Sequence, residues 1–205
     1  DSGFECLEKI KSGEKYDVIL LDDMMPKMSG TDTFNIINND IKKYIISGDE
    51  DKNSENFKKV INDTNFIDIN DKYELIYNKG YEPILLMGIS SNYKDNHIKK
   101  TIDKLNKEIK EKYKYSILIL HEPDFIDEID YSKFNLILSG HSLGGVIKLP
   151  FISNIIKNKY SQNYYDSYYN LNNTLLYISN GIGTNKYKIR LLNMPSINFY
   201  RLRNK

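Results

Sequence analysis

The stretch that decides the fold is residues 134–150, which read FNLILSGHSLGGVIKLP. Residues 134–138 form an apolar run too short for a helix, so we predict a buried strand that ends at Ser139-Gly140. Just past this strand come the imidazole of His141 and the hydroxyl of Ser142. In layered α/β proteins, binding groups usually lie beyond the carboxyl ends of strands. The stretch therefore predicts an α/β fold with a functional site at one edge of its sheet.

The same residues match the nucleophile-elbow motif G-x-S-x-G, since Gly140, Ser142 and Gly144 occupy its fixed positions. The match looks like the lipase form of the motif, which implies a serine esterase with Ser142 as nucleophile. That triad requires a histidine after the serine, and none of the three histidines follows Ser142. Pro150 also interrupts the helix that should follow the elbow. The serine esterase is therefore kept only as an alternative.

A second resemblance takes in more of the chain, because four blocks occur in the order that one family has them. They are residues 44–51 (YIISGDED), 116–124 (SILILHEPD), 139–145 (SGHSLGG) and 177–184 (YISNGIGT). The set resembles calcineurin-like metallophosphoesterases, over about residues 31–205. The resemblance implies an α/β fold: a layered αββα sandwich of mixed sheets that is incomplete at its amino end.

The resemblance also implies metal ligands. His121 matches the family's lone histidine, and His141 matches the first histidine of its Gly-His-x-His block. Asp49 stands at the asparagine of its Gly-Asn-His block, and Asp22, at the end of an upstream strand, is a candidate fourth ligand. These residues correspond to the ligands of one metal in a two-metal centre. Such a donor set suits Zn²⁺, Mn²⁺ or Fe²⁺, so we expect one divalent ion rather than two.

Two departures from the family pattern predict weak activity. Leu143 replaces the second histidine of the Gly-His-x-His block, and Glu50 stands at the position of the catalytic histidine. An ionised glutamate only accepts hydrogen bonds, so it cannot donate to the negative charge that develops on a phosphate ester. The resemblance thus implies a degenerate or truncated phosphoesterase, whose partner is a small phosphate ester or none.

The amino-terminal residues resemble a different family. Residues 16–21 (YDVILL) predict a buried strand that ends at Asp22-Asp23, before the loop MMPKMSG. Residues 1–34 look like the middle of a response-regulator receiver domain, with Asp22 at the phosphoacceptor position. We therefore predict a receiver-like fragment at 1–34 and a partial phosphoesterase domain at 35–205. A signalling module phosphorylated on Asp22 is an alternative, although the receiver strand that carries the Mg²⁺-binding acidic pair is absent.

Net charge, apolar runs and cysteine count limit the partners and the location that we expect for this chain. The formal net charge of +1 at pH 7 gives no electrostatic attraction to nucleic acid or to an anionic membrane. No apolar run approaches the ~18 residues that a membrane span needs. The single cysteine, Cys6, excludes an internal disulfide and a cysteine-rich zinc site. We expect a cytoplasmic protein. Because the chain begins at Asp1 rather than with methionine, we also expect a missing upstream part that could carry an anchor.

Hydrophobic spacing predicts the remaining elements. A long amphipathic helix is predicted at 98–109, capped by Asp95 or Asn96, and a second at 54–62. Strands are predicted at 42–46, 73–77, 84–89, 116–120, 134–138, 175–179, 189–192 and 197–202, with a loop at 159–173.

Two groups of polar residues are expected to have no catalytic role. His97, at the start of the long predicted helix, is expected to be an ordinary surface residue. Asp124, Asp127 and Asp130 are predicted to be turn and cap residues rather than metal ligands.

Overall fold

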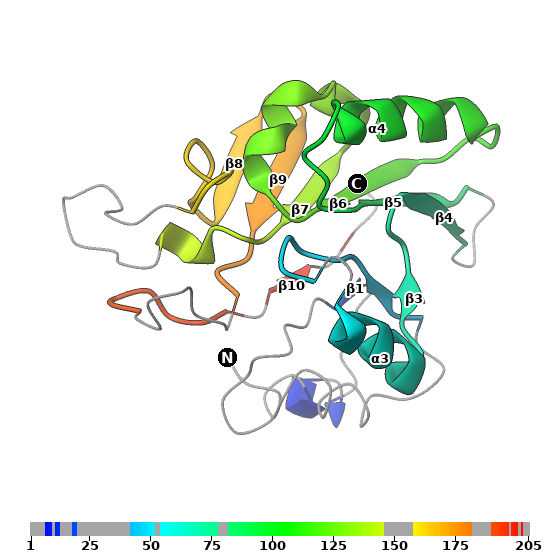
Figure 1. The fold of residues 1–205 in the computed structure, drawn as a ribbon. Helices are drawn as coiled ribbons and strands as arrows, with labels where there is room; N and C mark the ends of the chain where they lie inside the picture. The colour runs from blue at the N-terminus through cyan, green and yellow to red at the C-terminus, as the bar shows by residue number, and fades with distance from the viewer. Residues whose placement is uncertain are drawn as a thin grey trace.

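The main unit is a six-stranded mixed sheet (Figure 1). The structure is a computed structural model that describes residues 7–9, 11–12, 18–19, 42–51, 54–77, 82–145, 158–181, 190–196, 198–200 and 202. The strands are β4 (Lys72–Ile76), β5 (Ile84–Ile89), β6 (Tyr115–Leu120), β7 (Leu136–Ser139), β8 (Tyr168–Leu171) and β9 (Thr174–Ile178). Their order is β4-β5-β6-β7-β9-β8. The inner four strands are parallel, and the two edge strands are antiparallel to their neighbours.

Both faces of the inner strands are buried, which is why β5, β6 and β7 read as nearly continuous apolar runs. Alternate side chains of a strand point to opposite faces. Leu85 and Met87 of β5 therefore belong to one core cluster and Leu86 to the other. Helix α4 (His97–Glu108) covers the first cluster with three buried side chains, Ile98, Ile102 and Leu105.

A second layer covers the opposite face of the sheet. It consists, in the described residues, of two small sheets: β2 (Tyr44–Ile45) parallel to β3 (Ile67–Asp68), and β1 (Val18–Ile19) antiparallel to β10 (Phe199–Tyr200). Helix α3 (Glu55–Thr64) lies beyond this layer, on the side away from α4 (Figure 1). The order of layers is helix, sheet, sheet, helix. The predicted α/β sandwich is confirmed.

Gly88 in β5 allows the two layers to approach closely. A Cβ at this position would lie 2.5 Å from Cγ2 of Ile69 and 2.7 Å from the Ile69 carbonyl oxygen. Both distances are much shorter than a van der Waals contact. Asn70, the next residue, forms an isolated parallel bridge with Gly88. Only glycine leaves room for a neighbouring backbone at this distance.

Most predicted elements are found, with small shifts at their ends. Asn96 does precede α4, but its side chain makes no capping hydrogen bond, so the predicted cap is wrong in that respect. The loop predicted at 159–173 is also partly wrong, because Tyr168–Leu171 forms the edge strand β8. Of the last two predicted strands, the described residues contain only Phe199–Tyr200 as a strand.

The described residues also include three short 3₁₀ helices, none of which is long enough to form a layer, and helical residues at 7–9 and 11. The 3₁₀ helices are Pro123–Glu128, Tyr131–Lys133 and Leu143–Gly145. Within the described part of the chain, no helix combines the length and the apolar character that crossing a membrane requires. Asp22, the rest of residues 20–41 and Pro150 lie outside the described residues. The boundary between a receiver-like fragment and the sandwich therefore stays a prediction.

We predict that Gly88→Ala lowers the free energy of unfolding by about 1–3 kcal/mol, because the added methyl group overpacks the contact between the two layers. Gly140→Ala is a matched control, since the nearest non-neighbouring heavy atom to its Cβ would be Nδ1 of His121 at 3.8 Å. Urea unfolding followed by circular dichroism compares the variants. Equal stability of Gly88→Ala and the wild type would contradict the close approach of the layers.

Candidate metal centre

The candidate site lies where strand ends from both layers meet. Asp49 follows β2, whereas His121 and His141 follow the parallel neighbours β6 and β7. Parallel strands bring the residues beyond their carboxyl ends to one edge of a sheet. One ligand-type atom from each of Asp49, His121, Glu122 and His141 lies within 4.8 Å of the others. The structure thus brings together three of the predicted ligands and adds Glu122.

Asp49 lies between the two imidazoles. Its Oδ1 is 3.4 Å from Nε2 of His121 and 3.6 Å from Nδ1 of His141. The two rings meet edge to face, with centroids 5.2 Å apart and an interplanar angle of 69°. The polar contacts with His121 and His141 hold the pKa of Asp49 well below its usual range. Asp49 is therefore a carboxylate, and its charge faces both ring nitrogens.

The backbone around His141 fixes which nitrogen faces the centre. Nε2 of His141 donates to the carbonyl oxygen of Lys159 at 2.6 Å, so Nδ1 is left to face Asp49. Nδ2 of Asn158 also donates to the carbonyl oxygen of His141 at 2.6 Å. A hydrogen bond from the second ring nitrogen to a carbonyl is the usual way in which a metal-binding histidine is oriented.

Opposing effects set the pKa of His141. Burial lowers this pKa, but the hydrogen bonds to Asp49 and to the Lys159 carbonyl, together with the charge of Asp49, outweigh burial and raise it. A protonated Nδ1 cannot coordinate an ion, so metal binding must displace that proton. The ring is oriented so that a cation and a proton would compete for Nδ1.

Gly48 allows His121 to lie against the backbone before Asp49. A Cβ on Gly48 would be 2.8 Å from Nε2 of His121, too close for any other residue to be accommodated without movement of the ring. The Gly48 N–H donates to Oδ2 of Asp51 at 3.0 Å, which closes the turn that carries Asp49. Gly48 therefore leaves space for the ring of His121, and the turn places the carboxylate of Asp49 next to that ring.

Glu122 is not among the ligands predicted from the sequence. Its side chain is fully buried. Oε1 accepts hydrogen bonds from Oγ of Ser91 at 2.6 Å and from the hydroxyl of Tyr93 at 2.7 Å, whereas Oε2 has no hydrogen-bond partner. Burial, with the hydrogen bond to Glu122, raises the pKa of Tyr93, so this hydroxyl remains a donor. The signal in the sequence is a carboxylate directly after a histidine at the end of an apolar strand.

Two other positions singled out in the sequence, Glu50 and Leu143, do not belong to the cluster. Glu50 is exposed in the turn beside Asp49 and is not one of the four clustered residues. Leu143 has a left-handed backbone (φ 49°), and its carbonyl oxygen accepts a hydrogen bond from Nδ2 of Asn193. Asp22 lies outside the described residues.

Ser142, the alternative nucleophile, is fully buried. Its Oγ accepts a hydrogen bond from the Gly144 N–H at 3.1 Å and donates to the Tyr165 carbonyl at 3.5 Å. Neither contact provides the imidazole base that a serine nucleophile needs. The geometry of Ser142 therefore gives the serine esterase no support.

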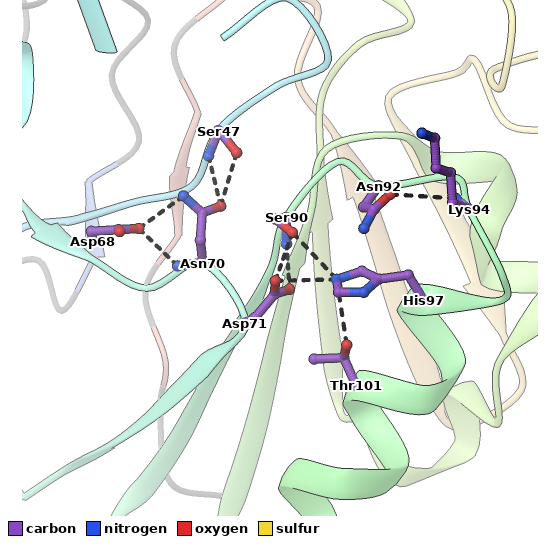
Figure 2. A network of polar contacts seen from close by, with 9 residues as sticks. All are labelled: Ser47, Asp68, Asn70, Asp71, Ser90, Asn92, Lys94, His97 and Thr101. Carbon is purple, nitrogen blue, oxygen red and sulfur yellow. Dashed lines mark hydrogen bonds and ion pairs between the residues drawn. The ribbon is translucent and has the colours of Figure 1, made fainter. Parts of the chain in front are cut away.

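The expectation for His97 is wrong, because its side chain is tied into the fold rather than free on the surface. Nε2 of His97 is 3.1 Å from Oδ2 of Asp71, with Oγ of Ser90 at 3.5 Å and Oγ1 of Thr101 at 3.4 Å (Figure 2). This cluster links the start of α4 to Asp71, just before β4, and to Ser90, just after β5. Its residues are distinct from the four at the candidate metal centre.

Two further contacts hold the loops of the site. Oδ1 of Asn70 accepts from both the backbone N–H and the hydroxyl of Ser47, just before Gly48 (Figure 2). The carboxylate of Asp124 accepts from the backbone N–H groups of residues 162–164, next to the segment that contacts His141. Asp124 lies in the 3₁₀ helix Pro123–Glu128, and its carboxylate caps a distant segment; it is not one of the four clustered residues. Both contacts position the candidate ligands indirectly.

Comparison with known proteins found a metallophosphoesterase. The chain is 37% identical over 89 residues to an uncharacterized metallophosphoesterase, YkuE, from Bacillus subtilis (strain 168). The matched segment is 43% of this chain and 31% of that protein, so the chain spans about a third of the relative's length. No protein-family model matches the chain. The match supports the resemblance to metallophosphoesterases and leaves the receiver-like fragment a prediction.

Proposed function

We propose that this chain is a metallophosphoesterase-type domain that binds one divalent ion through Asp49, His121 and His141 and hydrolyses phosphate esters. The observation that carries the proposal is the convergence of these side chains, from both layers, with their ligand atoms within 4.8 Å. The 37% identity to a metallophosphoesterase supports the reaction class.

The residues present fit a divalent ion. Imidazole and carboxylate donors suit Zn²⁺, Mn²⁺ or Fe²⁺. Nδ1 of His141 faces the centre because Nε2 is bound to the Lys159 carbonyl. Oε2 of Glu122 is buried without a hydrogen-bond partner, although buried polar atoms normally have one. A cation would satisfy these groups and balance the charge of Asp49.

Each side chain of the centre has a separate role in the proposed reaction. A divalent ion bound here would supply activation of water and would offset the charge of the phosphoryl oxygens. His121 and His141 would hold it from the six-stranded sheet, and Asp49 would hold it from the second layer. The Lys159 carbonyl keeps His141 in the binding orientation, and Gly48 gives the ring of His121 its space.

We also infer that turnover is slow. Leu143 offers no donor where the family has a second histidine, so the residues at hand support one ion rather than two. Glu50 is an exposed carboxylate beside Asp49, where an anionic substrate would approach. A carboxylate there repels the phosphate and cannot donate a hydrogen bond to it.

We predict that Zn²⁺ or Mn²⁺ raises the melting temperature of the wild type but not of His121→Ala, which lacks one ligand. An ion that binds only the folded state stabilises it by about 2.7 kcal/mol when present at 100 times Kd. Scanning calorimetry measures the shift. His97→Ala is the matched control, since it removes a partly buried imidazole outside the cluster and should keep the shift. No shift in the wild type, or an equal shift in His121→Ala, would refute the ion site.

We predict that wild-type protein hydrolyses bis(p-nitrophenyl) phosphate slowly and only with the metal, and that Glu50→His raises kcat. Restoring one donor to the developing charge is worth up to about 10²–10³-fold. Glu50→Ala separates the two causes, because it removes the repulsion without adding a donor and should gain less. The phosphoesterase proposal is untenable if neither the wild type nor Glu50→His shows metal-dependent hydrolysis.

A further inference from the structure

We propose that Glu122 is a fourth protein ligand of the ion and that it binds through Oε2. The inference rests on the ion site proposed above and extends it, because the resemblance to metallophosphoesterases assigns no role to this position. Three independent observations on the described residues support it: the burial of the side chain, its distance from the other donors and the way in which its other oxygen is held.

Burial makes the free oxygen of Glu122 informative. The side chain has no exposed surface, and its Oε2 has no hydrogen-bond partner. A buried carboxylate is normally paired with a cation or surrounded by donors, because removing its charge from water is costly. Oε1 already has two hydroxyl donors, so Oε2 is the oxygen that still requires a partner.

A carboxylate oxygen of Glu122 lies close to the other candidate ligands. The donor atoms of Glu122, Asp49, His121 and His141 are within 4.8 Å of one another. Two atoms that bind one Zn²⁺ at about 2.0–2.2 Å can be no more than about 4.4 Å apart. Small side-chain adjustments therefore let one ion contact all four. The shell would consist of two imidazoles and two carboxylates, and the latter would neutralise a divalent charge.

Rigid neighbours hold Oε1 and so fix the direction of Oε2. Ser91 and Tyr93, between β5 and α4, both donate to Oε1. The ring of Tyr93 packs on Phe125 and Tyr160, with centroid distances of 5.3 and 4.4 Å. Oγ of Ser91 is also 3.4 Å from the Ser47 carbonyl, on the segment that leads to Asp49. Groups that orient a ligand in this way commonly change metal affinity when they are removed.

The test is zinc affinity measured by isothermal titration calorimetry in the chelator-treated protein, with Co²⁺ absorption as a second readout. Glu122→Gln keeps the shape and both hydroxyl contacts but loses the charge. We expect its zinc affinity to fall by more than about 10–100-fold, the range typical for loss of a group that only orients a ligand. We also expect the Co²⁺ spectrum to change and the metal-free melting temperature to stay the same or rise, because a buried unpaired charge is gone.

Asp71→Asn is the matched control, since it neutralises a carboxylate in the separate His97 cluster and should leave zinc affinity unchanged. Tyr93→Phe, which frees one side of Oε1, should weaken zinc binding less than Glu122→Gln does. If the wild type binds no zinc, the ion site itself fails. If the wild type binds zinc and Glu122→Gln binds it equally well, with the same Co²⁺ spectrum, Glu122 is only a structural anchor and the inference is overturned.

If Glu122→Gln does not fold, variants of the two hydroxyl donors test the proposal instead. Tyr93→Phe and Ser91→Ala leave Glu122 in place and remove one hydrogen bond each. A loss of zinc affinity in both variants supports coordination by Glu122. Wild-type affinity in both, with folded protein, rejects it.

Discussion

The contact of Asp49 with two imidazoles joins the two layers of the sandwich. Asp49 comes from the layer of β2, whereas His121 and His141 come from the six-stranded sheet, and one carboxylate oxygen lies within 3.6 Å of a nitrogen of each ring. The contact requires close approach of the layers. Glycines at 48 and 88 provide it, because a side chain at either position would collide with the opposite layer. The site therefore depends on packing as much as on its polar residues.

The apolar runs of β5, β6 and β7 could be predicted because strands buried on both faces have few polar residues. Strand β8 is not predicted from the sequence, because its residues are Tyr, Tyr, Asn and Leu, which show no clear alternation of apolar and polar types. Its alternating exposure follows from its pairing with β9. The two histidines and Asp49 could be found because their blocks resemble the ligand-bearing blocks of metallophosphoesterases. For Glu122 the only signal is its place directly after His121. The burial of Glu122 and the contacts of His97 could not be predicted, since their partners, such as Ser91 and Asp71, are distant in sequence.

The proposed chemistry follows from what the centre keeps and what it lacks. It keeps two oriented imidazoles, a carboxylate between them and a buried carboxylate with one free oxygen. It lacks a histidine at position 143, and it has an acidic side chain at position 50. Under the proposal, such a centre would hold one ion and activate water but would give little help to the developing charge of the phosphoryl group. The proposal therefore treats ion binding and turnover as properties that experiments can separate.

The most direct test of the central claim is X-ray absorption at the zinc edge of the zinc-loaded protein. The account predicts one zinc per chain, with scattering from two imidazole rings and oxygen ligands near 2.0–2.2 Å, roughly the distances usual for such sites, and no metal–metal vector. Zinc without imidazole scattering, or a second metal at the roughly 3.5–4 Å typical of two-metal centres, would contradict it.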